Sequence, residues 1–171
     1  MASLSDYNAG LLHGSWIDAD QAPDELHEAV SDMLTRSPTT GAEEFAIHDF
    51  EGFGDYRVGE YDSLDWVNRI ACGIVEHGPA FGAWAEHCAH DEDALERFDD
   101  AYLGQWSSVE AYAEELLDDL GYLRAVEENV PDMIQPYVCV DIEAFARDLE
   151  LSGDLTVVEH GFGVWLFEGS L

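Results

Sequence analysis

One short segment gathers the side chain types that most often bind transition metals. Residues 87–91 read HCAHD, and Cys72 or His77 would be available as further ligands. Zinc sites usually contain two pairs of Cys or His at short spacing, and this segment lacks a clear second pair. We therefore interpret it as a buried cysteine beside surface histidines, and we expect neither a metal nor a cofactor.

A second group, His48 and Asp49 with Glu44, has the residue types of an acid–base site. The three lie in an alternating segment typical of a strand, where a histidine is more often packed or hydrogen-bonded than catalytic. The chain contains no glycine-rich nucleotide loop, no EF-hand loop, no H-E-x-x-H and no G-x-S-x-G. We therefore expect a protein that is not an enzyme, with no catalytic residues.

Carboxylates are the most abundant charged groups. The segment 107–121 predicts a helix that begins with a capping box of Ser107 and Glu110 and stops at Gly121. Val109, Ala113, Leu116, Leu117 and Leu120 fall on one stripe of this helix. The rest of its surface carries five acidic residues and no basic one. Like charges four positions apart destabilise a helix by about 0.2–0.5 kcal/mol per pair, so a usual surface helix would intersperse Lys or Arg.

The same one-signed pattern recurs elsewhere in the second half of the chain. A solvated polar face explains any single cluster, but repetition without cationic relief favours a binding surface. The predicted partner-binding carboxylates are Asp91, Glu92, Asp93, Glu96, Asp99, Asp100, Glu110, Glu114, Glu115, Asp118, Asp119, Glu127, Glu128, Asp132, Asp141, Glu143 and Asp148.

Composition makes the charge argument general. The 171 residues include 38 Asp and Glu against six basic residues, all arginine, and the formal net charge is −32. Hydrophobic residues make up 47% and aromatic residues 12%, which excludes the usual interpretation of a highly charged chain as disordered. Direct binding to nucleic acid or to an anionic membrane is disfavoured, because both are negative. The expected partner is a strongly basic surface, and the most basic protein surfaces are those built for nucleic acid.

The charge is of the magnitude found on DNA. Duplex DNA carries one charge per ~1.7 Å of axis, so 32 charges correspond to about 54 Å of duplex. A compact globule of this length has a diameter of roughly 40 Å. The match therefore requires a chain that is drawn out rather than spherical.

Three cysteines in irregular spacing indicate free thiols. The sequence shows no signal peptide and no apolar run of the ~18 residues that a membrane span needs. We expect a cytoplasmic protein.

The pattern of apolar residues predicts an α+β fold, in an elongated chain of three small domains. Residues 1–60 form an α+β domain with strands at 11–18 and 44–50 and a helix at 24–34. Residues 61–103 form a helical domain, capped first by Asp62 or Ser63, interrupted at Gly78-Pro79, and ending in a helix that carries residues 94–98. Residues 104–171 form a second α+β domain with the helix at 107–121, a helix from Asp141 to about 149, and a hairpin of 155–159 with 164–167.

Four sequence blocks resemble one family. Residues 7–19 contain the run Y-N-x-G-x-L-x-G-x-W-x-D, and Ser37-Pro38 is followed by AEEFAIHDFEGF at 42–53. The third block is FDDAYLGQW at 98–106 followed by EAYA at 110–113. The fourth is YVCVD at 137–141 with FARDL at 145–149 and SGD at 152–154. In this order the blocks resemble the ArdA antirestriction family, whose members usually have a longer first strand before the first block.

The resemblance implies an elongated, curved protein of three domains that forms a homodimer through its C-terminal region. It implies a surface that mimics bent B-form DNA, with carboxylates in place of phosphates. Such a protein binds the methyltransferase core of type I restriction-modification enzymes and excludes DNA from it. Members are typically encoded on mobile genetic elements. Whether methylation is blocked as well as cleavage stays open.

Three alternatives use the same charge. A halophilic enzyme or binding domain also combines excess acid with absent lysine, and it should unfold at low salt, where a DNA mimic stays folded. A DNA mimic directed at a nucleoid protein, a repair enzyme or a CRISPR effector is a second. The third is an acidic chaperone-like module for basic proteins, which needs no ordered shape.

Overall fold

The computed structural model describes residues 1–169 and contains nine α-helices, one 3₁₀ helix and two small antiparallel sheets within that range. The fold is therefore α+β, as expected. The chain divides into two compact units, one formed by Met1–Leu95 and one beginning at Glu96. A finer division into three domains stays a prediction.

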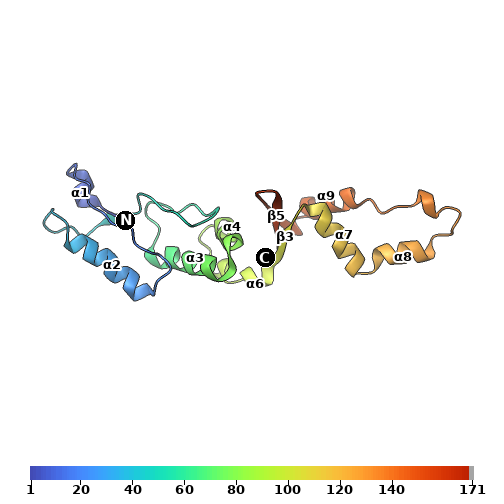
Figure 1. Ribbon diagram of the computed structural model, residues 1–171, viewed down its shortest axis with the longest axis horizontal. Helices are drawn as coiled ribbons and strands as arrows, with labels where there is room; N and C mark the ends of the chain where they lie inside the picture. The colour runs from blue at the N-terminus through green and yellow to red at the C-terminus, as the bar shows by residue number, and fades with distance from the viewer. Residues whose placement is uncertain (170–171) are drawn as a thin grey trace. The chain divides into compact units, whose positions relative to one another are not determined.

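The first unit is mainly helical (Figure 1). Its elements are β1 (Ala2–Ser3), α1 (Leu4–Asn8), α2 (Pro23–Thr35), β2 (Phe45–Ala46), α3 (Leu64–His77), α4 (Pro79–Cys88) and α5 (Glu92–Leu95). Leu26, Val30 and Met33 on one face of α2 pack against Leu64 of α3 as a buried cluster. This spacing of three and four residues is the apolar stripe that makes α2 amphipathic.

Helix boundaries in this unit follow local rules. Of the two predicted caps, Asp62 and Ser63, it is Ser63 whose side chain accepts from the backbone N–H of Trp66 and caps α3. The α3 helix ends at Gly78, whose φ of 84° lies in the left-handed region that favours glycine, and Pro79 begins α4. The predicted third helix is interrupted at Arg97, so that Leu95 ends α5 and Phe98 begins the next helix, α6.

Both strands predicted in the first unit were wrong in extent. Residues 11–18 contain only an isolated bridge between Gly14 and Ala2, and 44–50 contributes only the two residues of β2. The ladder partner of β2 is β1, which is equally short. Hydrogen bonds from Ser3 to His13 and from Ile47 to Glu60 connect the loops instead, so alternating side chains here lie on ordered loops.

The second unit packs helices on a three-stranded sheet. Its elements are α6 (Phe98–Ala101), β3 (Tyr102–Trp106), α7 (Val109–Asp119), α8 (Tyr122–Asn129), η1 (Gln135–Tyr137), α9 (Ile142–Ser152), β4 (Leu155–His160) and β5 (Gly163–Glu168). The strand order is β3-β5-β4, and the predicted terminal hairpin is β4 with β5. Strand β3 and helices α8 and η1 were not predicted.

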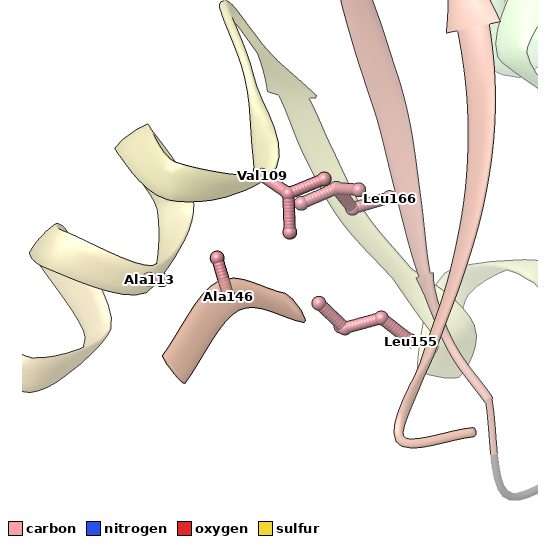
Figure 2. Packing of buried hydrophobic residues seen from close by; sticks show 5 residues of the cluster. All are labelled: Val109, Ala113, Ala146, Leu155 and Leu166. Carbon is pink, nitrogen blue, oxygen red and sulfur yellow. The ribbon is translucent and has the colours of Figure 1, made fainter. Parts of the chain in front are cut away.

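The core of this unit joins both helices to the sheet. Val109 and Ala113 of α7, Ala146 of α9, and Leu155 and Leu166 of the hairpin form one buried cluster (Figure 2). The small Ala113 and Ala146 side chains are 0% and 2% exposed, which lets the two helices approach closely. The residues of α7 that face away from this cluster are therefore held in a fixed orientation.

Candidate partner-binding surface

Helix α7 is buried on one side and carries carboxylates on its exposed side. Val109, Ala113 and Leu117 are buried, whereas Leu120, predicted to share the stripe, is 58% exposed. The N-cap is Ser108 and not Ser107: its hydroxyl accepts from the backbone N–H of Ala111 at 3.2 Å. The predicted capping box is therefore wrong by one residue, because a box on Ser108 would need a Glu or Gln where Ala111 stands.

Every carboxylate predicted for the partner-binding surface has an exposed position in the structure. Several of them also have a local structural role, and four examples show it. Glu92 forms an ion pair with Arg69 at 2.6 Å, and Glu128 forms one with Arg124 at 2.8 Å. Asp91 and Asp141 accept from backbone N–H groups at the starts of α5 and α9.

The α7 carboxylates differ from those four. Within the described part of the chain, Glu114, Glu115, Asp118 and Asp119 form no ion pair. Glu110, in the first turn, has a pKa held below its ordinary value by hydrogen bonds with the Ser108 side chain and with the backbone. The exposed side of α7 is thus negative from its first turn to its last at neutral pH. We call Glu110, Glu114, Glu115, Asp118 and Asp119 the α7 acidic face.

In the first unit the sequence-based prediction included only Asp91, Glu92 and Asp93, although slightly more than half of the 38 acidic residues lie there. Several are exposed on its loops and on α2, including Asp18, Asp20, Asp24, Glu25 and Glu51. Those on the loops are interspersed with glycines and aromatics, whereas Asp24, Glu28 and Asp32 follow one another at four-residue spacing on the exposed side of α2. The signal that could have identified the loop residues was the total charge, and for α2 it was the four-residue spacing of its acids.

One carboxylate of the first unit is buried. Asp6 is 0% exposed and accepts hydrogen bonds from Ser37 at 2.6 Å and from Thr39 at 2.5 Å. Burial by itself raises the pKa of Asp6, but hydrogen bonds with Ser37, Thr39 and Ser3 and the nearby His13 outweigh it and lower the pKa to about 2. Asp6 therefore fixes α1 to the loop after α2 and belongs to the fold, not to the surface.

A second structural carboxylate lies in a hydrogen-bonded chain. The Trp66 indole donates to the Tyr56 hydroxyl at 2.8 Å, and this hydroxyl donates to Asp62 at 2.9 Å. The Gly59 backbone donates to the same Asp62 oxygen at 2.8 Å. Burial raises the pKa of Tyr56, so its proton stays in this chain at neutral pH.

The segment 87–91 separates its candidate metal ligands. Cys88 is 8% exposed, and burial together with Asp91 raises the pKa of its thiol to about 11. His87 lies against the ring of Trp84, while His90 lies against Trp66 and 3.6 Å from Asp62. Among residues 1–169, no three His, Cys, Asp or Glu side chains are grouped as metal ligands would be.

His48 and Asp49 also lack an acid–base arrangement. His48 lies 3.9 Å from Glu60 and edge-on to the ring of Tyr7, and Asp49 accepts from the backbone N–H of Phe50. The predicted third member, Glu44, contributes its backbone carbonyl, which accepts from the N–H of Leu4. These contacts are those of residues that shape loops.

The architecture and the acidic surface together define an ordered α+β protein whose exposed chemistry is dominated by carboxylates. The family model described as antirestriction protein (ArdA) matches residues 1–164. The chain therefore belongs to the ArdA family of antirestriction proteins, which are inhibitors rather than enzymes, and restriction-modification enzymes are the class of partner that this family implies. No curated protein matches the chain. None of the helices in the described range is long and apolar enough to cross a membrane.

Proposed function

We propose that this protein is a DNA mimic that occupies the DNA-binding groove of type I restriction-modification enzymes, at the methyltransferase core. The observation that carries the proposal is the α7 acidic face, which is exposed, of one sign and mounted on a packed helix. A groove built for duplex DNA is lined with basic residues, and it attracts such a surface over long range. Occupation of the groove excludes DNA, and the protein itself does not bind nucleic acid.

The packing of α7 distinguishes a DNA mimic from a protein that is only acidic. The buried cluster around Ala113 and Ala146 fixes the direction in which the carboxylates of α7 point. A basic groove then gains charge pairing without the entropy cost of ordering its ligand. An acidic chaperone-like module would not need this packing.

A competition assay tests the proposal. A type I methyltransferase bound to labelled cognate DNA is titrated with the protein at two salt concentrations, and cleavage and methylation are followed in parallel. We expect displacement that weakens as salt rises, because exposed charges are screened within a Debye length of about 10 Å at 0.1 M. Absence of displacement at low salt by folded protein contradicts this target.

Neutralising the whole α7 acidic face tests the surface itself. The variant with Gln at 110, 114 and 115 and Asn at 118 and 119 should inhibit more weakly while it remains folded. Any one of these substitutions alone should change little, because the Coulomb work is spread over many sites at high effective dielectric. Unchanged inhibition by the folded fivefold variant would exclude α7 as a contact surface.

The proposal includes an extended arrangement of the chain, because 32 charges match about 54 Å of duplex. Small-angle X-ray scattering measures this directly. The maximum dimension should exceed the roughly 40 Å expected for a compact globule of this size. The same samples at low salt should be folded, where a halophilic domain would lose structure.

We further propose that the protein forms a homodimer through a segment of the second unit that we call the apolar arm, residues 120–138. Six of its large apolar side chains are exposed: Leu120, Tyr122, Met133, Ile134, Tyr137 and Val138. Neither α8 nor η1 buries a residue. Exposed apolar patches of this kind mark interaction sites, and the arm carries fewer charges than α7 to oppose a second copy.

Sedimentation at a series of concentrations tests the dimer. The double variant Met133→Glu and Tyr137→Asp should shift the chain to monomer. Leu151→Asp is the matched control, because Leu151 is 78% exposed but lies on α9, outside the arm. A monomeric wild type at high concentration, or equal dissociation by the control, contradicts this interface.

A further inference from the structure

The first unit contains an apolar pocket that the acidic surface does not explain. Its volume is about 390 Å³, within the range of side chain and small-ligand sites. The pocket lies between two loops, which contribute residues 16–20 and residues 47 and 49–53, and one side of α3. Ile47, Val58 and Val67 are buried at its base, at 7%, 8% and 2% exposure.

Aromatic rings stand at the mouth of this pocket. Trp16 is 67% exposed and Phe50 is 40% exposed, and both line the cavity. Large aromatic side chains that remain exposed beside a cavity offer ring faces to an incoming group. A tryptophan face is the ring surface that attracts a cation most strongly.

Carboxylates complete the lining. Asp18, Asp20, Asp49 and Glu51 all line the pocket and are all exposed. The described residues around it include no arginine and no histidine. Met1 also lines the pocket, and its amino group donates to the Ser15 carbonyl at 3.1 Å; burial lowers the pKa of that amine although Asp49 opposes the shift. The pocket thus combines an apolar base, aromatic walls and a negative rim.

We propose that this pocket accepts an arginine side chain from the basic surface of the protein partner. This inference rests on the proposed function and adds an anchoring contact to it. The aliphatic stem of arginine fits an apolar base, while its planar guanidinium stacks on aromatic rings and pairs with carboxylates. Lysine is the poorer occupant, because its compact ammonium is strongly hydrated and does not stack as a plane. Partner recognition therefore includes a shaped site in addition to a distributed charge.

A peptide titration tests the site without a restriction enzyme. The probe is a blocked Gly-Ser-Arg-Ser-Gly peptide, with citrulline or lysine in place of arginine as comparison peptides. Binding to the full chain is followed by the chemical shift of the Trp16 indole. We expect saturable binding of the arginine peptide, weaker binding of the lysine peptide, and binding of the neutral citrulline peptide reduced about tenfold or more.

One single variant and two double variants separate binding in the pocket from attraction by the overall negative charge. Trp16→Ala should weaken arginine binding by about three- to tenfold, followed by backbone amide shifts of the pocket. The double variant Asp49→Asn and Glu51→Gln should weaken it by about fivefold. Asp24→Asn with Glu25→Gln is the matched control, because it removes two exposed carboxylates of the same unit that do not line the pocket. The Asp49→Asn substitution keeps a side chain oxygen that can accept from the Phe50 backbone, as the carboxylate of Asp49 does.

The outcomes are distinct. Equal weakening by the two double variants, or equal binding of the citrulline peptide, overturns the pocket as an arginine site. If either result overturns the pocket but the protein still displaces DNA from the enzyme in a salt-dependent manner, the proposed function stands. Specific peptide binding without displacement of DNA would retain the pocket and exclude type I enzymes as the partner.

Discussion

The two units share nearly the same excess of carboxylates but use them differently. In the first, Asp6 and Asp62 accept hydrogen bonds from hydroxyl and backbone groups, and Asp65 lies 3.0 Å from His27. In the second, the carboxylates of α7 point outward from a buried apolar cluster. All but one of the seven histidines lie in the first unit, close to its carboxylates.

This difference shows that composition does not decide what a carboxylate does. Its neighbours decide: Ser37 and Thr39 convert Asp6 into a structural group, whereas Glu114 and Asp118 are four residues apart with no cation between them. Carboxylates that accept hydrogen bonds inside the protein, such as Asp6, stabilise the fold. Carboxylates that repel each other on α7 destabilise the helix and are available to an external partner. Substitutions in the two sets should therefore have opposite signs.

The largest expected effect is from Asp6→Ala. It leaves the Thr39 hydroxyl without its acceptor and the Ser37 hydroxyl with only the Thr39 carbonyl, and unsatisfied groups away from water are costly. We expect the largest fall in unfolding midpoint of any single acidic substitution, measured by circular dichroism. Glu114→Ala is the control and should leave the midpoint nearly unchanged. Similar midpoints for the two variants would remove the distinction between the units.

The pH dependence of the same group gives a second comparison. The pKa of Asp6 is lowered from 3.8 to about 2, so its contribution to stability is complete above about pH 3.8 and is lost as the pH falls toward 2. The difference in unfolding free energy between wild type and Asp6→Asn should be constant from pH 7 to 5 and then shrink. Urea titrations of both proteins measure it, and the subtraction removes the titration of the other carboxylates. A difference that grows on acidification would contradict the assignment.

A smaller effect of opposite sign is expected on α7. Replacing Glu114, Glu115, Asp118 and Asp119 by Gln and Asn, with Glu110 retained, removes like-charge repulsion and negative charge near the helix C-terminus. The protein should gain about 1 kcal/mol in unfolding free energy at low salt. The gain should shrink with added salt, as measured in parallel urea titrations. A loss of stability would mean that these carboxylates have partners that hold α7 in place.

The reactivity of the three thiols compares buried with exposed groups in the folded protein. Cys72 and Cys139 are exposed, whereas Cys88 is buried with its thiol pKa raised to about 11. At pH 8, two thiols should react rapidly with a disulfide reagent and the third only slowly, because the thiolate is the reactive form. Kinetics of colour release on the native protein, compared with Cys88→Ala, measure this. Three equally fast thiols would place Cys88 at the surface.

Elements with strong local signals were predictable from the sequence. Ser63, Asp141 and Gly153 fixed helix ends through their side chains or a positive φ, and the apolar spacing of α2 identified its buried face. The alternation at 11–18 misled, because a strand needs a partner of matching length and β1 has two residues. Strand β3 was missed because its pairing with β5 is a contact between residues about 60 positions apart. Local pattern carries no such information.

The candidate surface was predictable only where local helical spacing determines it. Exposure of acidic positions on α7 follows from helical spacing, so that set was placed correctly on the solvent side. The pocket of the first unit was not, since it brings Trp16, Asp49 and Val67 together from three separate segments. Asp6 was also indistinguishable from the exposed acids until Ser37 and Thr39 were seen beside it.

The absence of any buried side chain in α8 and η1 has a consequence for how the protein can be studied. An eight-residue helix with no buried residue is marginal in water, so its amide protons should exchange with solvent much faster than those of α7 or α9. If a second copy covers the apolar arm, protection of these amides rises with protein concentration while that of α7 stays constant. Deuterium uptake in residues 122–138 thus measures self-association without an attached probe or a substitution.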